Sequence, residues 1–233
     1  MIDPVILSKE PTTLVGGGMV GAQDIALAFG LAPRIVAADG GAAAALQYGH
    51  VPDAVIGDFD SLDSQTKAMI PPDNLHPVSE QDSTDFEKAL TRIDAPLIIA
   101  VGFSGARIDH QLAVLHGMLR HADRPCILLA EREVILHCPP RFELQMREGA
   151  VVSLFPLQPV TGRSAGLHWP IDGLAMAPGQ QIGTSNRATG GLLRLEMDGP
   201  GMIALLPRAQ LAQVTRALLN CAPEHARWPA PGR

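Results

Sequence analysis

The stretch RIVAADGGAAAALQYGHVPDAVIGDFDS, residues 34–61, decides the fold. A largely apolar run, Arg34–Ala38, ends at an Asp-Gly-Gly turn, and a second run, Ala54–Ile56, ends at Gly-Asp-Phe-Asp. Apolar runs without alternation are typical of strands that are buried on both faces of a parallel sheet. The segment between them, Ala42–Tyr48, predicts a helix. Strand, helix and strand in this order predict a β-α-β unit with parallel strands.

The same pattern extends in both directions along the first half of the chain. Further strands are predicted at Thr13–Val15, Leu97–Val101 and Ile127–Ala130. Further helices are predicted at Gln23–Phe29, Ser64–Met69, Thr84–Arg92 and Asp109–His121. We therefore expect an α/β protein whose N-terminal domain, residues 1–128, is a doubly wound, Rossmann-like parallel sheet.

The second half of the chain changes character near Glu131. Short apolar runs are punctuated by Gly and Pro, which favours antiparallel strands in a sandwich or a barrel. The expected strands are Val134–His137, Glu143–Met146, Val151–Phe155, Gly166–Trp169, Gln181–Thr184, Leu192–Met197 and Met202–Leu205. We expect a C-terminal all-β sandwich domain over residues 129–233. A helix over Ala209–Asn220 and a Pro-rich tail that frays should follow the strands.

The net charge of −6 is unevenly distributed. Residues 1–125 carry 16 acidic and 8 basic residues, a net charge of −8, whereas residues 126–233 carry 8 acidic residues and 10 Arg, a net charge of +2. The chain has no long basic stripe, which argues against a nucleic-acid partner. Three cysteines without a CxxC pair, and no apolar run of membrane-spanning length, favour a cytoplasmic protein without disulfides or a membrane partner.

Two aspartates follow the strand that ends at Ile56. Asp58 and Asp60 are spaced i, i+2, so both carboxylates can project on one side. Ligands of open parallel sheets bind beyond the carboxyl ends of the strands. Two hard oxygen donors there suit Mg²⁺, which takes the rest of its shell from water and phosphates. The alternative is a solvated turn with Asx caps.

A second acidic segment is QDSTDFEKAL, residues 81–90. We expect Asp82 or Ser83 to cap the following helix and Asp85 to lie in its first turn, where the helix dipole favours an acid. Three acids within six residues exceed what capping needs. The segment is therefore a second candidate for metal or phosphate chemistry.

A third candidate segment is GARIDH, residues 105–110. The guanidinium fork of Arg107 is suited to a phosphate. Asp109 either caps the next helix or holds a metal ion. His110 either shuttles a proton, binds phosphate or simply packs.

Glycines follow two of the predicted strands. Gly17 and Gly18 come after the first strand, where glycine lets a phosphate approach the backbone N–H groups. A plain tight turn explains them equally well. Asp39, Gly40 and Gly41 follow the second strand, where the carboxylate faces a ligand or caps the helix that begins nearby.

The β-rich half offers two polar or aromatic candidates. Ser185 and Asn186 lie in GTSN, which taken alone reads as an ordinary loop. Trp169 is one of two tryptophans, and its ring could stack on a flat cationic heterocycle. Packing in the core is the alternative for Trp169.

Taken together, these segments resemble the thiamine pyrophosphokinase family. The stretches that carry the resemblance are AADGGAAAALQYGHVPDAVIGDFDSL (37–62), QDSTDFEKAL (81–90), GARIDHQLAVL (105–115), GLHWPIDG (166–173) and GTSNRATGG (183–191). They occur in the family's order and spread over most of the chain. The resemblance implies an N-terminal domain that binds ATP and Mg²⁺, a C-terminal domain that binds thiamine, and a homodimer with active sites shared between subunits.

The resemblance also implies roles for individual residues. The catalytic set is Asp58, Asp60, Asp82, Asp85 and Asp109, and the metal ligands among them are Asp58, Asp60, Asp85 and Asp109. The nucleotide contacts are Gly17, Gly18, Asp39, Gly40, Gly41, Arg107 and His110. The thiamine contacts are Gln81, Trp169, Ser185 and Asn186.

The implied reaction is in-line attack of the thiamine hydroxyl on the β-phosphorus of ATP, with AMP as the leaving group. A diphosphokinase for a pterin alcohol is the nearest rival, because its acidic half would look alike. A glycosyltransferase that uses the DxD motif would leave the second acidic segment without a role. A nucleotide-binding sensor without catalysis would need only the phosphate loop.

Overall fold

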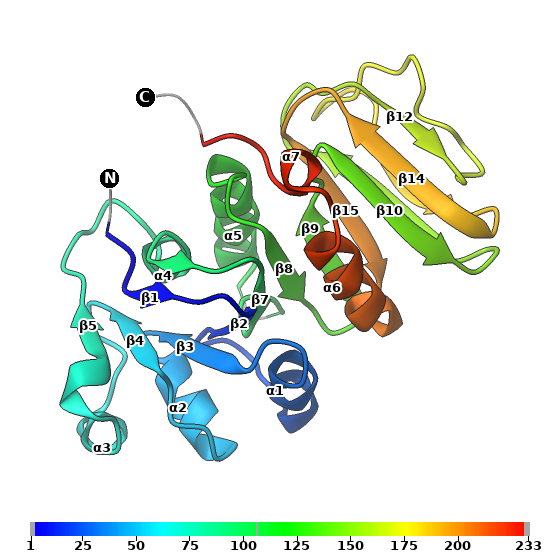
Figure 1. The fold of residues 1–233 in the computed structure, drawn as a ribbon. Coiled ribbons are helices and arrows are strands. Elements are labelled where there is room, and N and C mark those ends of the chain that lie inside the picture. The colour runs from blue at the N-terminus through cyan, green and yellow to red at the C-terminus, as the bar shows by residue number, and fades with distance from the viewer. Residues whose placement is uncertain (1–2, 106, 231–233) are drawn as a thin grey trace. The chain divides into compact units, whose positions relative to one another are not determined.

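The computed structural model describes residues 3–105 and 107–230. The chain has a mixed α/β fold and divides into two compact units (Figure 1). Unit 1 comprises Met1–Gly117 with Leu128–Ala130, and unit 2 comprises Met118–Ile127 with Glu131–Arg233.

Unit 1 is built on parallel strands. They are β1 (Ile6–Leu7), β2 (Thr12–Val15), β3 (Arg34–Ala38), β4 (Ala54–Gly57), β5 (Leu75–Pro77), β6 (Ile93–Asp94), β7 (Ile98–Val101) and the end of β8 (Cys126–Leu129). β2 pairs with β7, β3 with β4, and β4 with β5, all in parallel, while β2 lies against β3. The hydrogen-bonded orders are β5-β4-β3 and β2-β7-β8, with β2 beside β3, and β1 pairs with β6 separately. Every residue of β2, β4 and β7 is buried, as the unbroken apolar runs predict.

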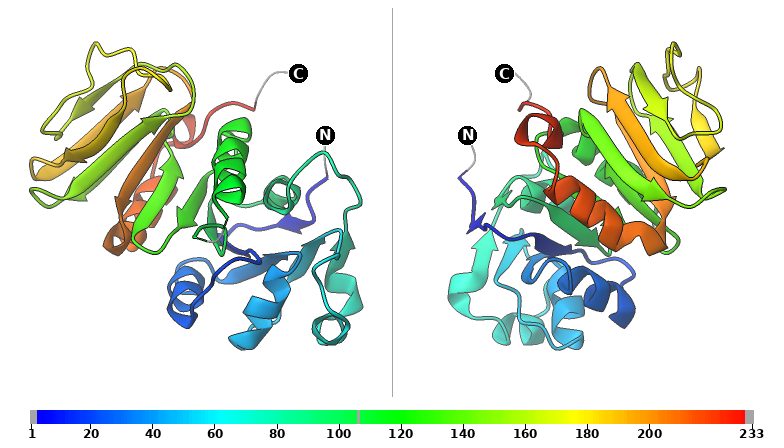
Figure 2. Two further views of the ribbon diagram at one scale, coloured as in Figure 1. Left: turned by 180° about the vertical axis from the view of Figure 1, so that it is seen from behind. Right: turned by 45° about the vertical axis from the view of Figure 1, so that its right-hand side comes forward.

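The helices of unit 1 lie on both faces of this sheet. They are α1 (Ala22–Phe29), α2 (Gly41–Gln47), α3 (Ser64–Ala68), the 3-10 turn η1 (Pro72–Asn74), α4 (Asp85–Leu90) and α5 (Ile108–Arg120). Helices α1, α2 and α3 cover one face, and α4 and α5 cover the other (Figures 1 and 2). The chain runs from β2 outward to β5 and then returns to β7 on the other side of β2. Such a reversal opens a crevice at the carboxyl ends of the strands.

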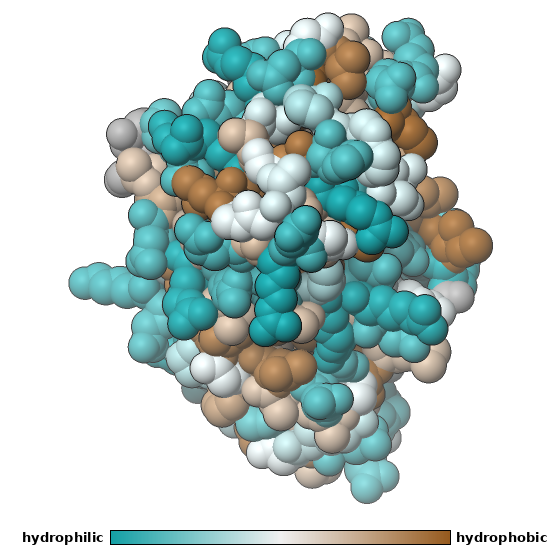
Figure 3. Space-filling model, turned by 90° about the vertical axis from the view of Figure 1, so that its right-hand side faces the viewer, coloured by the Kyte–Doolittle hydropathy of each residue, from teal (hydrophilic) through white to brown (hydrophobic). Residues whose placement is uncertain are grey.

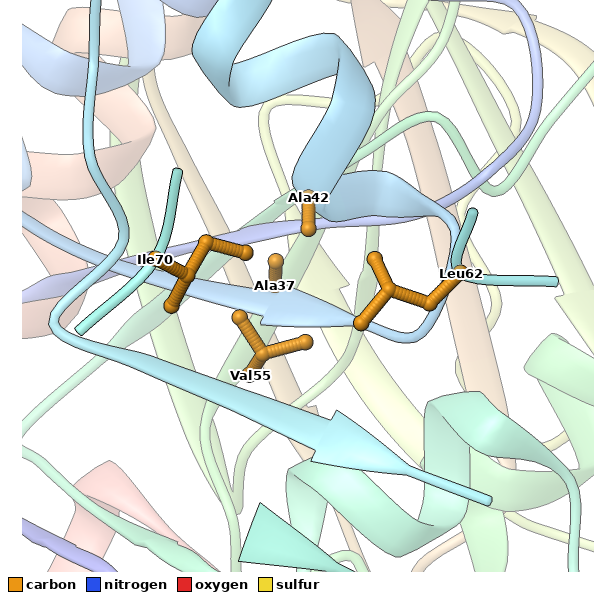
Figure 4. Packing of buried hydrophobic residues seen from close by; sticks show 5 residues of the cluster. All are labelled: Ala37, Ala42, Val55, Leu62 and Ile70. Atoms are coloured by element: carbon orange, nitrogen blue, oxygen red, sulfur yellow. The ribbon is translucent and has the colours of Figure 1, made fainter. Parts of the chain in front are cut away.

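Small residues allow α2 to approach the sheet closely. Ala37, Ala42, Val55, Leu62 and Ile70 form one buried cluster between β3, β4 and the neighbouring helices (Figure 4). At the first residue of α2, a Cβ atom on Gly41 would clash with the Val15 carbonyl group. The start of α2 is therefore fixed directly against the end of β2.

Unit 2 contains two antiparallel sheets. Its strands are β9 (Glu133–His137), β10 (Arg141–Met146), β11 (Val151–Pro156), β12 (Gly162–Ala165), β13 (Gly183–Arg187), β14 (Gly191–Met197) and β15 (Met202–Pro207). One sheet contains the order β13-β11-β15-β9 and the other the order β10-β14-β12. Buried and more exposed residues alternate along β10, β11 and β14, so one face of each sheet is packed. The turn η2 (Arg208–Gln210), α6 (Leu211–Leu219) and α7 (Pro223–Ala226) follow.

Unit 2 differs from the sequence prediction at three places. The strand predicted over Gly166–Trp169 is wrong, because Gly166 has a φ of +82° and only Leu167 forms an isolated bridge there. The strand lies just before this turn, as β12. The strand predicted over Gln181–Thr184 begins only at Gly183. The predicted fraying of the tail is wrong at Trp228, whose indole N–H donates to the Cys138 carbonyl oxygen at 2.8 Å.

One face of the molecule is mainly hydrophilic, and its hydrophobic residues form small separate groups (Figure 3). Scattered apolar side chains of this kind are ordinary on protein surfaces. Within residues 3–105 and 107–230, none of the helices combines the length and the apolar character needed to cross a membrane.

Candidate functional site

A cavity of about 660 Å³ lies at the carboxyl edge of the unit 1 sheet. It collects segments that follow β2, β3, β4, β5 and β7, together with the start of α5. The predicted site residues that line it are Gly17, Gly18, Asp39, Gly40, Asp58, Gln81, Asp85, Arg107 and His110. The expected convergence of the acidic and glycine-rich motifs on one edge of the sheet is therefore confirmed.

Other predicted residues of unit 1 do not line this cavity. Asp60 lies beside it, next to Asp58. Asp82 is exposed, and Asp109 is exposed at the start of α5. Gly41 is the buried first residue of α2, where its small size serves packing against the end of β2 rather than contact with the cavity.

The glycines after β2 have different surroundings. A Cβ atom on Gly18 would lie 2.5 Å from the Gly102 carbonyl oxygen, and the Gly18 N–H already donates to that oxygen at 2.9 Å. A Cβ atom on Gly17 would meet nothing closer than 3.6 Å. Gly18 therefore allows the loops after β2 and β7 to approach each other closely, whereas Gly17 faces the cavity.

Asp39 is the most buried carboxylate of the cavity, with 2% of its surface exposed. It follows β3 in a left-handed conformation, with φ of +43°. Its Oδ2 accepts the Ser61 N–H at 3.2 Å, but its Oδ1 has no hydrogen-bond partner among the described residues. Burial, with a contribution from the nearby Asp85, raises the pKa of Asp39. A buried oxygen without a donor is suited to a bound cation.

Asp58 and Asp60 lie close to Asp39. One carboxylate oxygen from each of the three lies within 4.8 Å of the others. Between Asp58 and Asp60, Phe59 has a φ of +65°, and its side chain packs against the buried cluster that contains Ala37 and Leu62. This packing stabilises an uncommon backbone conformation for a side-chain-bearing residue. The three hard oxygen donors, including the unpartnered Asp39 Oδ1, fit a small divalent cation.

Lys88 is a member of the site that the sequence analysis missed. Its side chain is 3% exposed, and its Nζ lies 2.9 Å from Asp58 Oδ2 and 3.1 Å from Asp85 Oδ1. The hydrogen bond from Lys88 lowers the pKa of Asp58. Burial alone would lower the pKa of Lys88, but its bonds to Asp58 and Asp85 raise that pKa overall. The i, i+3 spacing from Asp85 was the signal in the sequence that could have revealed it.

The start of α4 also differs from expectation. Neither Asp82 nor Ser83 caps the helix: Thr84 is the N-cap, and its Oγ1 accepts the Glu87 N–H at 3.3 Å in a capping box. Threonine followed three residues later by Glu is the sequence signature of this motif. Asp85 lies in the first turn of the helix, as predicted, and its Oδ1 accepts from Lys88 Nζ at 3.1 Å.

Arg107 and Asp109 pair with each other. Two bonds join them, Nη2 to Oδ2 at 2.6 Å and Nε to Oδ1 at 3.1 Å, and both side chains are largely exposed. The guanidinium holds the pKa of Asp109 below its usual range. An exposed pair of this kind is weak, so a phosphate could compete for Arg107.

In unit 2, Asn186 holds the backbone of Trp169. Its Oδ1 accepts the Trp169 N–H at 3.1 Å and the Arg187 N–H at 2.8 Å, and its Nδ2 donates to the Trp169 carbonyl oxygen at 2.7 Å. Asn186 is 4% exposed, whereas Trp169 is 56% exposed. Ser185 has a φ of +61° beside them. The structure therefore brings Trp169, Ser185 and Asn186 together and leaves the indole ring accessible on unit 2.

Comparisons with known proteins agree over both halves of the chain. Residues 27–129 match the thiamin pyrophosphokinase catalytic domain, and residues 133–198 match the thiamin pyrophosphokinase vitamin B1 binding domain. The chain is 27% identical over 156 residues to thiamin pyrophosphokinase 1 of Caenorhabditis elegans, which covers 59% of this chain and 63% of that protein. It is 27% identical over 181 residues to thiamine pyrophosphokinase 1 of Arabidopsis thaliana, which covers 67% of this chain and 66% of that protein.

Solved structures show the same fold. Thiamin pyrophosphokinase from Geobacillus thermodenitrificans aligns with a TM-score of 0.70 and 25% identity, over 84% of this chain and 96% of that one. Thiamin pyrophosphokinase from Candida albicans aligns with a TM-score of 0.69 and 16% identity, over 89% of this chain and 97% of that one, and shows likeness of fold alone. Two domain matches that together span most of the sequence, and this fold, establish that the chain belongs to the thiamine pyrophosphokinase family.

Proposed function

We propose that the chain transfers the diphosphate of ATP to the hydroxyl of thiamine, giving thiamine diphosphate and AMP. The observation that carries this proposal is the cavity at the carboxyl edge of unit 1, which is lined by Asp39 and Asp58 of the three-carboxylate cluster, by open backbone at Gly17, and by Arg107. Membership of the thiamine pyrophosphokinase family supports it. The chain spans about two thirds of the length of these relatives.

Asp58, Asp60 and Asp39 are the proposed holders of Mg²⁺. When bound, Mg²⁺ would neutralise the phosphate oxygens that gain negative charge during the transfer. Asp85 and Asp109 remain proposed ligands, although in this structure Asp85 binds Lys88 and Asp109 binds Arg107. Either carboxylate would have to exchange its partner in order to reach a metal ion.

The remaining residues of the cavity would position the nucleotide and the acceptor. Diphosphate transfer depends mainly on alignment and charge neutralisation. We propose that the backbone at Gly17 and Gly40 receives the phosphates, with Arg107 and His110 as side-chain contacts. Gly18 and Gly41, which were also predicted to contact nucleotide, would act by shaping the loops.

Asp82 or Asp85 would accept the proton that leaves the thiamine hydroxyl. Gln81, which donates to Asp58 Oδ2 at 3.3 Å, would place the acceptor near the carboxylates. In unit 2 we propose that Trp169 stacks on the cationic heterocycle, with Ser185 beside it and Asn186 holding the Trp169 backbone.

The same proposal covers the organisation of the chain. We infer that residues 1–128 form a doubly wound, Rossmann-like domain for ATP and Mg²⁺, and that residues 129–233 form a β-sandwich for thiamine. The parallel strand order with helices on both faces supports the former, and the two antiparallel sheets support the latter. We also propose a cytoplasmic homodimer in which some residues act on the substrate of the other subunit.

Replacement of the paired aspartates tests the proposed site. We expect Asp58→Asn and Asp60→Asn each to lower Mg²⁺-dependent formation of thiamine diphosphate by about a hundredfold or more. Each variant lacks one of the negative carboxylate charges that would hold Mg²⁺. The exposed Asp73 supplies the matched control, and Asp73→Asn should keep full activity with an unchanged melting temperature. Undiminished turnover in both site variants would remove the carboxylates from the mechanism.

A further inference from the structure

Lys88 is a buried cation inside the carboxylate cluster. It lies on α4 with 3% of its side chain exposed, and its Nζ joins Asp58, after β4, to Asp85, in the first turn of α4. An ammonium group is seldom buried unless carboxylates compensate its lost hydration. The buried ammonium group of Lys88 therefore depends on the carboxylates of Asp58 and Asp85, and it links these two carboxylates to each other.

The two oxygens of Asp58 differ because of Lys88. Asp58 Oδ2 accepts from Lys88 Nζ at 2.9 Å and from Gln81 Nε2 at 3.3 Å. Asp58 Oδ1 accepts only a long bond of 3.4 Å from the Asp60 N–H among the described residues. Oδ1 thus keeps most of its capacity to accept, on the side of Asp60.

Without Lys88, no basic side chain would offset the negative charges of the carboxylate cluster among the described residues. Asp39, Asp58 and Asp60 have oxygens within 4.8 Å of one another, and Asp85 raises the pKa of Asp39 in addition to burial. Lys88 is the basic residue that bonds to this group among the described residues. Arg107, which also lines the cavity, is paired with Asp109.

We propose that Lys88 is a positioning residue that limits the affinity of the site for divalent cations and presents Asp58 through one oxygen only. The inference rests on the proposed diphosphate transfer. In that reaction, a loosely held metal ion can enter and leave the site together with the nucleotide. The mechanism is electrostatic. At about 5 Å, even with the dielectric constant of water, a unit charge repels a divalent ion enough to weaken its binding by roughly tenfold.

Titration with Mn²⁺ alone, without nucleotide or thiamine, tests the inference. Lys88→Met keeps the length of the side chain and removes its charge, so we expect Mn²⁺ to bind at least tenfold more tightly than to the wild type. Lys88→Arg should restore an affinity within about threefold of the wild type, because it keeps the charge. Lys9→Met, at an exposed lysine outside the site, is the matched control and should leave Mn²⁺ affinity unchanged.

Thermal unfolding with and without Mn²⁺ separates this role from a merely structural one. We expect Mn²⁺ to raise the melting temperature of Lys88→Met more than that of the wild type, and to restore folding if the variant is unfolded without metal. An unchanged or weaker Mn²⁺ affinity of Lys88→Met, no added stabilisation by Mn²⁺, or an absence of Mn²⁺ binding by both the wild type and Lys88→Met would overturn the inference. Since these readouts need no turnover, failure of the proposed reaction would appear separately, as absence of thiamine diphosphate.

Discussion

Replacing Asn186 by alanine separates the stability of unit 2 from the binding of the acceptor. The variant loses three hydrogen bonds, two to the backbone of Trp169 and one to the Arg187 N–H. Each contributes about 1 kcal/mol net, and water reaches part of the exposed Trp169 turn, so we expect a loss of about 2–3 kcal/mol of unfolding free energy. For a chain of this size this corresponds to a fall in melting temperature of roughly 4–12 °C.

The same variant should weaken thiamine binding, because the indole ring loses its fixed backbone. Trp169→Ala removes the ring itself and should raise KM for thiamine by about 3–30-fold, the range expected for a cation stacked on an aromatic face. Because Trp169 is 56% exposed, its removal should change stability by less than about 1 kcal/mol. Asn186→Ala should raise KM for thiamine in the same direction, with KM for ATP within about twofold of the wild type in both variants.

The assay is steady-state kinetics at 25 °C, where both variants remain folded, together with thermal unfolding. Asn220→Ala, at an exposed asparagine after α6, is the matched control and should leave both readouts unchanged. If Asn186→Ala loses stability while KM for thiamine stays at the wild-type value, Asn186 does not position Trp169 for binding. If Trp169→Ala also leaves KM unchanged, the acceptor site lies elsewhere.

Two further predictions concern the scaffold. Burial lowers the pKa of His137 to about 4, and its Nε2 accepts the Gly201 N–H at 2.8 Å, so the neutral ring is the folded form. This stabilisation is complete above pH 6.5 and is lost as the pH falls toward 4. In urea unfolding, the free energy of unfolding of the wild type minus that of His137→Gln should therefore shrink by about 3 kcal/mol across that interval. A difference that stays constant with pH would refute this role of His137. Gly41→Ala should lower the free energy of unfolding by about 2–3 kcal/mol, because the added Cβ atom would clash with the Val15 carbonyl group. Gly17→Ala should lower it by less than about 1 kcal/mol. Equal melting temperatures for the two variants would contradict the packing of α2 against β2.

The parallel half of the fold is predictable because its signals are local. Strands that are buried on both faces require unbroken apolar runs, and β3 and β4 show them in residues 34–57. The chain direction then places whatever follows each strand at one edge of the sheet, which is why Asp39, Asp58 and Gly17 could be grouped without coordinates.

The rest of the site depends on tertiary packing. The i, i+3 spacing from Asp85 indicates an ion pair of Lys88, but the burial of Lys88 follows from how α4 sits on β3 and β4. The bonds between Asn186 and Trp169 join residues 17 positions apart, from β13 back to the loop that follows β12. Asp109 has the sequence context of a ligand, but Arg107, two residues earlier, binds it.

The central claim is that this chain transfers a diphosphate, and not a single phosphate, from ATP to thiamine. The most direct measurement is incubation of the wild-type protein with Mg-ATP and thiamine, followed by identification of both products. We expect thiamine diphosphate and AMP in equal amounts, with no turnover of a pterin alcohol under the same conditions. Formation of thiamine monophosphate with ADP, or no phosphorylated thiamine at all, would contradict the account.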